Sequence, residues 1–129
     1  MELLSKGRVI YDGDAEGRVL WSPASLSFFG GVDLEQGVVS EAGHPLAGES
    51  LAGKILVFPT GKGSTVGSYA LLRLARQGLA PAALVVGSCD TTVAVGAIIA
   101  EIPCVDQVEL EALRQVSVVS MKGSELWAP

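Results

Sequence analysis

The fold class of this chain follows from one stretch, KILVFPTGKGSTVGSYALLRLARQG, at residues 54–78. It opens with an uninterrupted apolar run at residues 54–58, which is typical of a central strand covered on both faces. Apolar residues then recur at helical spacing over residues 66–77, and the hydroxyl of Ser64 or Thr65 is a candidate cap for the start of that helix. The stretch therefore predicts a strand, a glycine-rich turn and a helix.

The segment after this helix is also predicted to alternate between strands and helices. A second buried strand completes a βαβ unit at residues 54–86, and the two strands of such a unit are parallel. Another short helix is predicted at residues 92–100, with Asp90 or Thr91 at its start, and a strand follows at residues 102–105. The middle of the chain is therefore of the α/β class.

Shorter β-prone segments flank this α/β region. Two runs of branched and aromatic residues around a Gly/Asp cluster predict a hairpin over residues 8–22. Residues 108–115 have a helical pattern, and two last strands are expected at residues 116–121 and 126–128. We expect residues 1–129 to form a single α/β domain in which a β-rich layer lies beside the βαβ unit.

Composition restricts the class of protein further. The chain has 129 residues, 49% of them hydrophobic, with a formal net charge of −5 and a mean hydropathy of +0.45, so it is not a disordered chain. No apolar run is long enough to span a bilayer and no signal-peptide pattern is present at the N-terminus, so we expect a cytoplasmic location. An acidic chain with few aromatic residues also argues against nucleic acid as a partner.

The cysteines give no sign of a metal site. Cys89 and Cys104 are the only two in the chain, and their spacing matches neither a disulfide framework nor a Cys/His metal pattern. We expect two buried thiols and no metal bound by this chain.

Charge is distributed unevenly along the sequence. Residues 1–49 carry −5, residues 50–89 carry +4 and residues 90–129 carry −4, so the βαβ unit is the only cationic segment. Its glycine-rich turn at residues 61–65 combines freed backbone N–H groups, the lysine Lys62 and the positive end of a helix, which together suit an anion such as a carboxylate or phosphate. The alternative, that the glycines only permit a tight turn while Ser64 caps the helix, is equally compatible with the pattern.

Familiar nucleotide and hydrolase motifs do not fit this turn. A P-loop requires lysine directly before the hydroxyl residue, whereas Gly63 separates Lys62 from Ser64 here. The dinucleotide fingerprint has its third glycine at the position that Val66 occupies. A serine hydrolase would depend on His44, the only histidine, which we expect at the surface of a Gly/Pro-rich loop.

Four segments together resemble a known family. They are FPTGKGSTVGSY at residues 58–69, SFFGGVD at 27–33, GES at 48–50 and AVGAIIAEIP at 94–103. They resemble the small subunit, or swivel domain, of the aconitase X dehydratases, and they are spread over most of the chain. The long serine loop and the AIIAEIP part are the specific elements of this resemblance.

The resemblance implies a swivelling β/β/α domain that packs over a large subunit holding a 4Fe-4S cluster. It also implies that Ser64 is the proton acceptor. Combined with the anion-site argument, it makes Gly61, Lys62, Gly63 and Thr65 candidate substrate-binding residues. The cluster is expected in the partner, because two cysteines cannot supply its thiolate ligands.

The substrate that the resemblance implies is one of two. Related enzymes dehydrate (R)-5-phosphomevalonate to trans-anhydromevalonate 5-phosphate in isoprenoid precursor synthesis, or act on cis-3-hydroxy-L-proline. A separate small chain favours phosphomevalonate. A non-catalytic anion-binding or regulatory module is the remaining alternative. An obligate partner also predicts an exposed apolar face, for which the Phe28 and Phe29 segment is the candidate, although both can equally be core residues.

Overall fold

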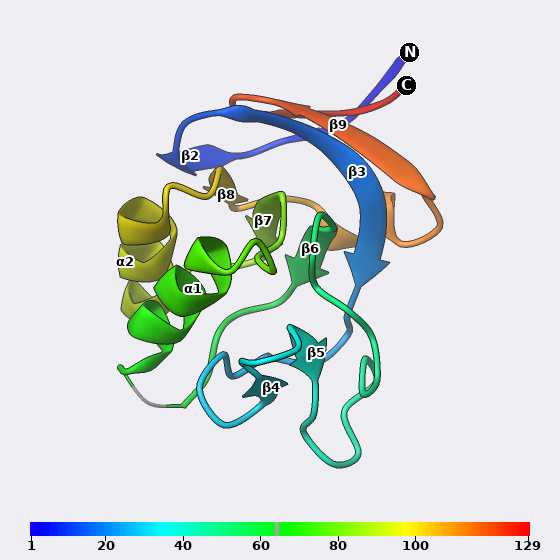
Figure 1. The fold of residues 1–129 in the computed structure, drawn as a ribbon. Helices are drawn as coiled ribbons and strands as arrows, with labels where there is room; N and C mark the ends of the chain where they lie inside the picture. Colours follow the sequence, from blue (N-terminus) through cyan, green and yellow to red (C-terminus); the bar gives the residue numbers. More distant parts are fainter. Residues whose placement is uncertain (64) are drawn as a thin grey trace.

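The computed structural model describes residues 1–63 and 65–129. These residues form an eight-stranded mixed sheet, two helices and a separate two-stranded sheet (Figure 1). The strands are β1 (Glu2–Lys6), β2 (Arg8–Tyr11), β3 (Asp14–Trp21), β4 (Val32–Asp33), β5 (Val38–Val39), β6 (Ile55–Phe58), β7 (Ala83–Val86), β8 (Cys104–Asp106), β9 (Val118–Lys122) and β10 (Glu125–Ala128). The helices are α1 (Gly67–Arg76), α2 (Thr91–Ala100) and the 3-10 turn η1 (Leu110–Leu113).

The large sheet has the strand order β1-β10-β9-β3-β6-β7-β8-β2. Strands β3, β6, β7 and β8 are parallel, whereas the outer pairs on both sides are antiparallel. The two edge strands, β1 and β2, are separated in sequence by Gly7 alone, so the sheet must curl until its edges meet. The N–H of Gly7 donates a 2.9 Å hydrogen bond to the carbonyl of Ser124, which ties this junction to the turn between β9 and β10.

The predicted βαβ unit at residues 54–86 is confirmed. β6 and β7 pair in parallel with Ile55 opposite Ala83 and Phe58 opposite Val86, and α1 connects them. All four residues of β6 are fully buried, as expected for a central strand. Leu56 and Phe58 face the core under the two helices, and Ile55 and Val57 face the second core inside the curled sheet.

Three other sequence expectations meet different outcomes. The hairpin over residues 8–22 is wrong, because β2 pairs with β8 whereas β3 pairs with β6 and β9. The reason is that a β-prone run identifies a strand but not its partner, and here both partners are distant in sequence. The expected helix at residues 108–115 is only the short turn η1. The two last strands are confirmed, and they pair antiparallel with Met121 opposite Leu126.

The two long helices lie side by side on one face of the sheet (Figure 1). Ala70, Leu71 and Leu74 of α1 and Val93 and Ala97 of α2 point into the same buried core. No helix in the described part of the chain is long and apolar enough to cross a membrane.

Candidate functional site

The glycine-rich loop leaves the carboxyl end of β6 and enters α1, at the edge of a parallel sheet where α/β proteins commonly bind ligands. α1 begins at Gly67, and its N-cap position is Val66, which makes no side-chain capping bond. The expectation that Thr65 caps the helix is therefore wrong: the helix begins one residue too late for its hydroxyl. Ser64, the alternative cap and the predicted proton acceptor, lies outside the described residues.

The first half of the loop is tied to neighbouring elements. The N–H of Gly61 donates to Oδ1 of Asp90 at 3.1 Å, and the N–H of Lys62 donates to the carbonyl of Leu26 at 3.1 Å. Within residues 1–63 and 65–129, the N–H groups of Gly63 and Thr65 have no hydrogen-bond partner. Among the described loop residues, these two amides are therefore candidates for contact with a ligand.

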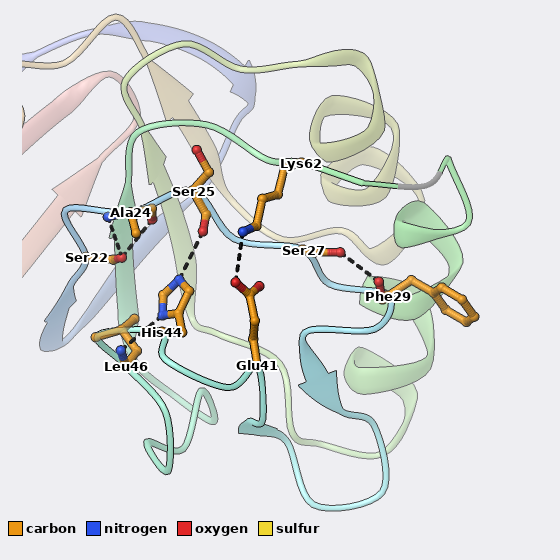
Figure 2. A network of polar contacts seen from close by, with 9 residues as sticks. All are labelled: Ser22, Ala24, Ser25, Ser27, Phe29, Glu41, His44, Leu46 and Lys62. Carbon is orange, nitrogen blue, oxygen red and sulfur yellow. Dashed lines mark hydrogen bonds and ion pairs between the residues drawn. The ribbon is translucent and has the colours of Figure 1, made fainter.

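The lysine of the loop is held by a carboxylate that the sequence analysis did not single out. Nζ of Lys62 lies 2.9 Å from Oε2 of Glu41, as Figure 2 shows, and both side chains are partly exposed. The hydrogen bond from Lys62 holds the pKa of Glu41 below its ordinary value. Glu41 follows β5 with no motif around it, so only the tertiary structure reveals the pair.

Gly63 lies where an added side chain would force the neighbouring Ser27 to move. Its φ is +96°, a left-handed conformation that favours glycine, and a Cβ there would lie 2.7 Å from Oγ of Ser27. The Ser27 hydroxyl donates a 2.7 Å hydrogen bond to the carbonyl of Phe29 (Figure 2). The SFFGGVD segment and the glycine-rich loop are therefore in direct contact.

The two phenylalanines of that segment take different places. Phe28 is buried and its ring meets Phe58 edge-on, with the ring centroids 5.8 Å apart. Phe29 is 50% exposed. The expectation that this pair forms an exposed apolar face is thus wrong for Phe28, whose ring completes the core beneath the loop, and correct for Phe29.

His44 is buried and not at the surface as the sequence analysis expected. Its Nδ1 accepts a 3.0 Å hydrogen bond from the N–H of Leu46, so Nε2 carries the proton and donates to the carbonyl of Ser25 at 3.0 Å (Figure 2). Both ring nitrogens are used within the fold. The histidine therefore fixes the segment that leads to Leu26, and it has no role as a catalytic base in this arrangement.

A cavity of about 320 Å³ opens beside the loop, between the starts of α1 and α2. It is lined by Thr65, Val66, Ser68, Tyr69, Thr91, Thr92 and Val95. Thr65 thus connects the loop to a largely apolar hollow between the two helices. In the part of the chain that the structure describes, no group of three or more His, Cys, Asp or Glu side chains could hold a metal ion.

The structure is an α/β fold in which a curled mixed sheet carries two helices on one face and a glycine-rich loop at the end of its central strand. Residues 4–126 match the family model of the aconitase X swivel domain, so the chain belongs to this family. The resemblance and the α/β fold class predicted from the sequence are confirmed. The chain is similar over 98% of its length to a crystal structure of Thermococcus kodakaraensis aconitase X in its holo form, with 47% identity, a TM-score of 0.90 and 96% of that chain covered.

Three relatives carry the name phosphomevalonate dehydratase small subunit. The protein from Thermococcus onnurineus is 49% identical, with 93% of this chain and 92% of that protein covered. The protein from Thermococcus kodakarensis is 54% identical over 84% of this chain and 82% of its own length. The one from Methanosarcina acetivorans is 51% identical over 93% and 85%. The chain is thus a hydro-lyase subunit of the aconitase X family.

Proposed function

We propose that residues 1–129 are the single swivel domain and small subunit of a heteromeric dehydratase that converts (R)-5-phosphomevalonate to trans-anhydromevalonate 5-phosphate. In this reaction the C–H bond next to the substrate carboxylate breaks and its proton passes to Ser64. The electron pair of that C–H bond forms a C=C double bond as the neighbouring C–O bond breaks, and the departing hydroxide takes up a proton from solvent and leaves as water. The observation that carries this proposal is the match to dehydratase small subunits over 93% of the chain. Its action in the cytoplasm stays a prediction.

The residues that flank Ser64 in sequence support a serine acting as a base. The N–H groups of Gly63 and Thr65 have no partner among the described residues, and α1 begins two residues after Thr65. Free amides and the positive end of a helix stabilise an anion, whether a serine alkoxide or a substrate carboxylate. Lys62, the residue before Gly63, contributes a positive charge to this segment, and its ammonium is paired with Glu41. These groups are the binding part of the proposed site, with Gly61 holding the loop's shape through Asp90.

The iron-sulfur cluster that the family implies does not fit this chain. Cys104 is buried and Cys89 is half-buried, and the residues outside position 64 contain no cluster of three or more possible metal ligands. We therefore assign the cluster to a large subunit and derive no step of this chain's chemistry through it. The role proposed for this chain is to bind an anionic group of the substrate and to accept the proton of its C–H bond.

The test is reconstitution with the large subunit from the same organism. The complex is expected to release anhydromevalonate phosphate from phosphomevalonate, followed by ³¹P NMR. Ser64→Ala is expected to lower kcat at least about 100-fold, the typical contribution of a general base, without unfolding the chain. Ser88→Ala, which changes an exposed serine after β7, is the matched control and retains full activity. Near-normal turnover by Ser64→Ala would remove the serine from the mechanism.

The alternative functions correspond to different results of the same assay. Turnover of cis-3-hydroxy-L-proline without turnover of phosphomevalonate would assign the other substrate. Equal turnover by the large subunit alone would make this chain a non-catalytic partner. Exchange of the substrate's acidic C–H for deuterium in D₂O reports proton removal directly, and it is expected to be lost in Ser64→Ala.

A further inference from the structure

The outer side of helix α2 exposes apolar side chains to solvent. Its sequence, TTVAVGAIIA, contains no charged residue, and such a helix is normally buried all round. Here the side chains of Val95, Ile98 and Ile99 are 42%, 50% and 39% exposed. They are spaced i, i+3 and i+4 and so lie on one face of the helix. Helix α2, which has no charged residue, therefore lies at the surface with apolar side chains exposed.

Exposed apolar side chains of α1 and the neighbouring loops continue this surface. Tyr69 is 67% exposed and, together with Val95, lines the cavity of about 320 Å³ between the helices. A second hollow of about 190 Å³ lies on the other side of Tyr69 and includes Phe29 and Arg73 in its wall. We call the whole surface the helix face, and it consists of Phe29, Val66, Tyr69, Val95, Ile98 and Ile99. Figure 1 shows the two helices side by side on the outside of the molecule.

The helix face has a cationic border. Arg73 and Arg76 are the only charged residues of α1, and both are exposed. Neither guanidinium forms an ion pair with any residue that the structure describes. Arg73 also forms part of the wall of the second hollow. A surface that covers the helix face would therefore be apolar at its centre and would carry carboxylates opposite Arg73.

The helix face also reaches the proposed active-site loop. Thr65, the residue after Ser64, lines the same cavity as Tyr69 and Val95. A second copy of this chain on the helix face would set one glycine-rich loop against another and would bring the arginines of α1 together. A large subunit seated there would bring the missing half of the site to the loop. Obligate interfaces are also the apolar ones, which matches an uncovered α2.

We propose that the helix face is the surface by which this chain docks on the large subunit of the dehydratase, with carboxylates of that subunit opposite Arg73. This inference rests on the proposed function, because it takes the large subunit as the occupant. It places the docking surface beside the loop that carries Ser64, so docking and completion of the active site are one event.

Binding of the full chain to the purified large subunit tests the inference. Ile98→Glu, on the part of α2 far from the loop, is expected to raise the Kd at least tenfold, and Arg73→Glu to raise it severalfold and to weaken its dependence on salt. Leu3→Glu changes a side chain of similar exposure on β1 and is expected to leave the Kd within twofold. At saturating large subunit, Ile98→Glu is expected to retain the wild-type kcat.

Hydrogen exchange provides a measurement that needs no variant. Addition of the large subunit to the wild-type chain is expected to slow amide exchange in residues 65–72 and 91–101 more than in residues 1–11. Wild-type binding that is unchanged by Ile98→Glu and leaves these segments unprotected would overturn the inference while the proposed function stands. A wild-type homodimer that Ile98→Glu dissociates would also overturn it, because the occupant would then be a second copy. Failure of the wild-type chain to bind any large subunit would overturn the proposed function as well.

Discussion

The backbone N–H of Gly61 donates a 3.1 Å hydrogen bond to Oδ1 of Asp90, the residue at the N-cap position of α2. Asp90 is thus where the sequence predicted the start of a helix, but its carboxylate does not cap that helix. It instead fixes the beginning of the glycine-rich loop. The Asp90 side chain therefore joins the start of α2 to the loop that carries Ser64.

Removing this link is expected to affect activity more than folding. Asp90→Ala leaves the N–H of Gly61 without its partner and is expected to lower kcat/KM of the reconstituted enzyme about tenfold, with about 1–2 kcal/mol lost from the free energy of unfolding. Asp90→Asn keeps an acceptor oxygen and is expected to retain most of both. Urea denaturation and steady-state kinetics measure the two effects. Equal kcat/KM values for the alanine and asparagine variants would contradict the prediction.

Gly63 and Gly30 allow a matched comparison, since both have a φ of +96°. Alanine costs about 1–2 kcal/mol in a left-handed conformation at either position. At Gly30 the added Cβ meets nothing within 4 Å, whereas at Gly63 it meets Oγ of Ser27 at 2.7 Å. Gly63→Ala is therefore expected to lower the free energy of unfolding further than Gly30→Ala. The double variant Gly63→Ala/Ser27→Ala recovers part of the difference, and no recovery would show that the clash is not the cause.

Lys62 and Glu41 form an ion pair, and substitutions of the two residues are expected to change KM in opposite directions. If the ammonium binds the substrate anion, Lys62→Met is expected to raise KM for phosphomevalonate about tenfold, because one hydrogen bond between charged groups is lost. Glu41→Gln releases the ammonium from its competing carboxylate and is expected to lower KM two- to threefold. A similar increase in KM in both variants would instead mean that Lys62 only positions the loop through Glu41.

The buried carboxylate of Asp106 predicts a loss of stability in acid. Burial alone would raise its pKa, but hydrogen bonds from Arg8 at 2.8 and 2.9 Å and from the N–H of Cys89 at 2.9 Å outweigh burial and lower it below the ordinary 3.8. The unfolded chain then binds this proton more readily, so the stabilisation is complete above pH 3.8 and is lost as the pH falls through the lower, folded-state pKa.

Asp106→Asn is therefore expected to flatten the acid limb of a plot of unfolding free energy against pH. Asp106→Ala is expected to cost about 2–3 kcal/mol at pH 7, because it also leaves the amide of Cys89 unpaired. Denaturation at a series of pH values measures both variants. An acid limb in Asp106→Asn as steep as in the wild type would assign the acid sensitivity to other groups.

The two cysteines are expected to differ in reactivity. A hydrogen bond from Cys104 lowers the pKa of the half-buried Cys89, and the same pairing together with burial raises the pKa of Cys104. Iodoacetamide is therefore expected to label Cys89 first at pH 7, as mass spectrometry of the peptides would show. Cys104→Ala removes the donor and slows labelling of Cys89. Faster labelling of Cys104 than of Cys89 would contradict this pairing.

The sequence by itself determined the central βαβ unit, the last two strands and the family. These rest on local patterns: the apolar run of β6, the helical spacing in α1 and a run of glycines and hydroxyls that few families share. Such patterns are readable because periodicity and turn chemistry act between residues close in sequence. The loop at residues 61–65 was selected as a candidate site for the same reason.

The tertiary structure alone decided which distant residues meet. It paired β2 with β8, brought Glu41 to Lys62 and Asp90 to Gly61, and buried His44 between two loops. No local pattern encodes these contacts, because each joins segments whose separation is set by how the sheet curls and where the chain crosses it. The uncovered side of α2 belongs to this group too, since a sequence shows that a helix is apolar but not which of its faces the fold leaves open.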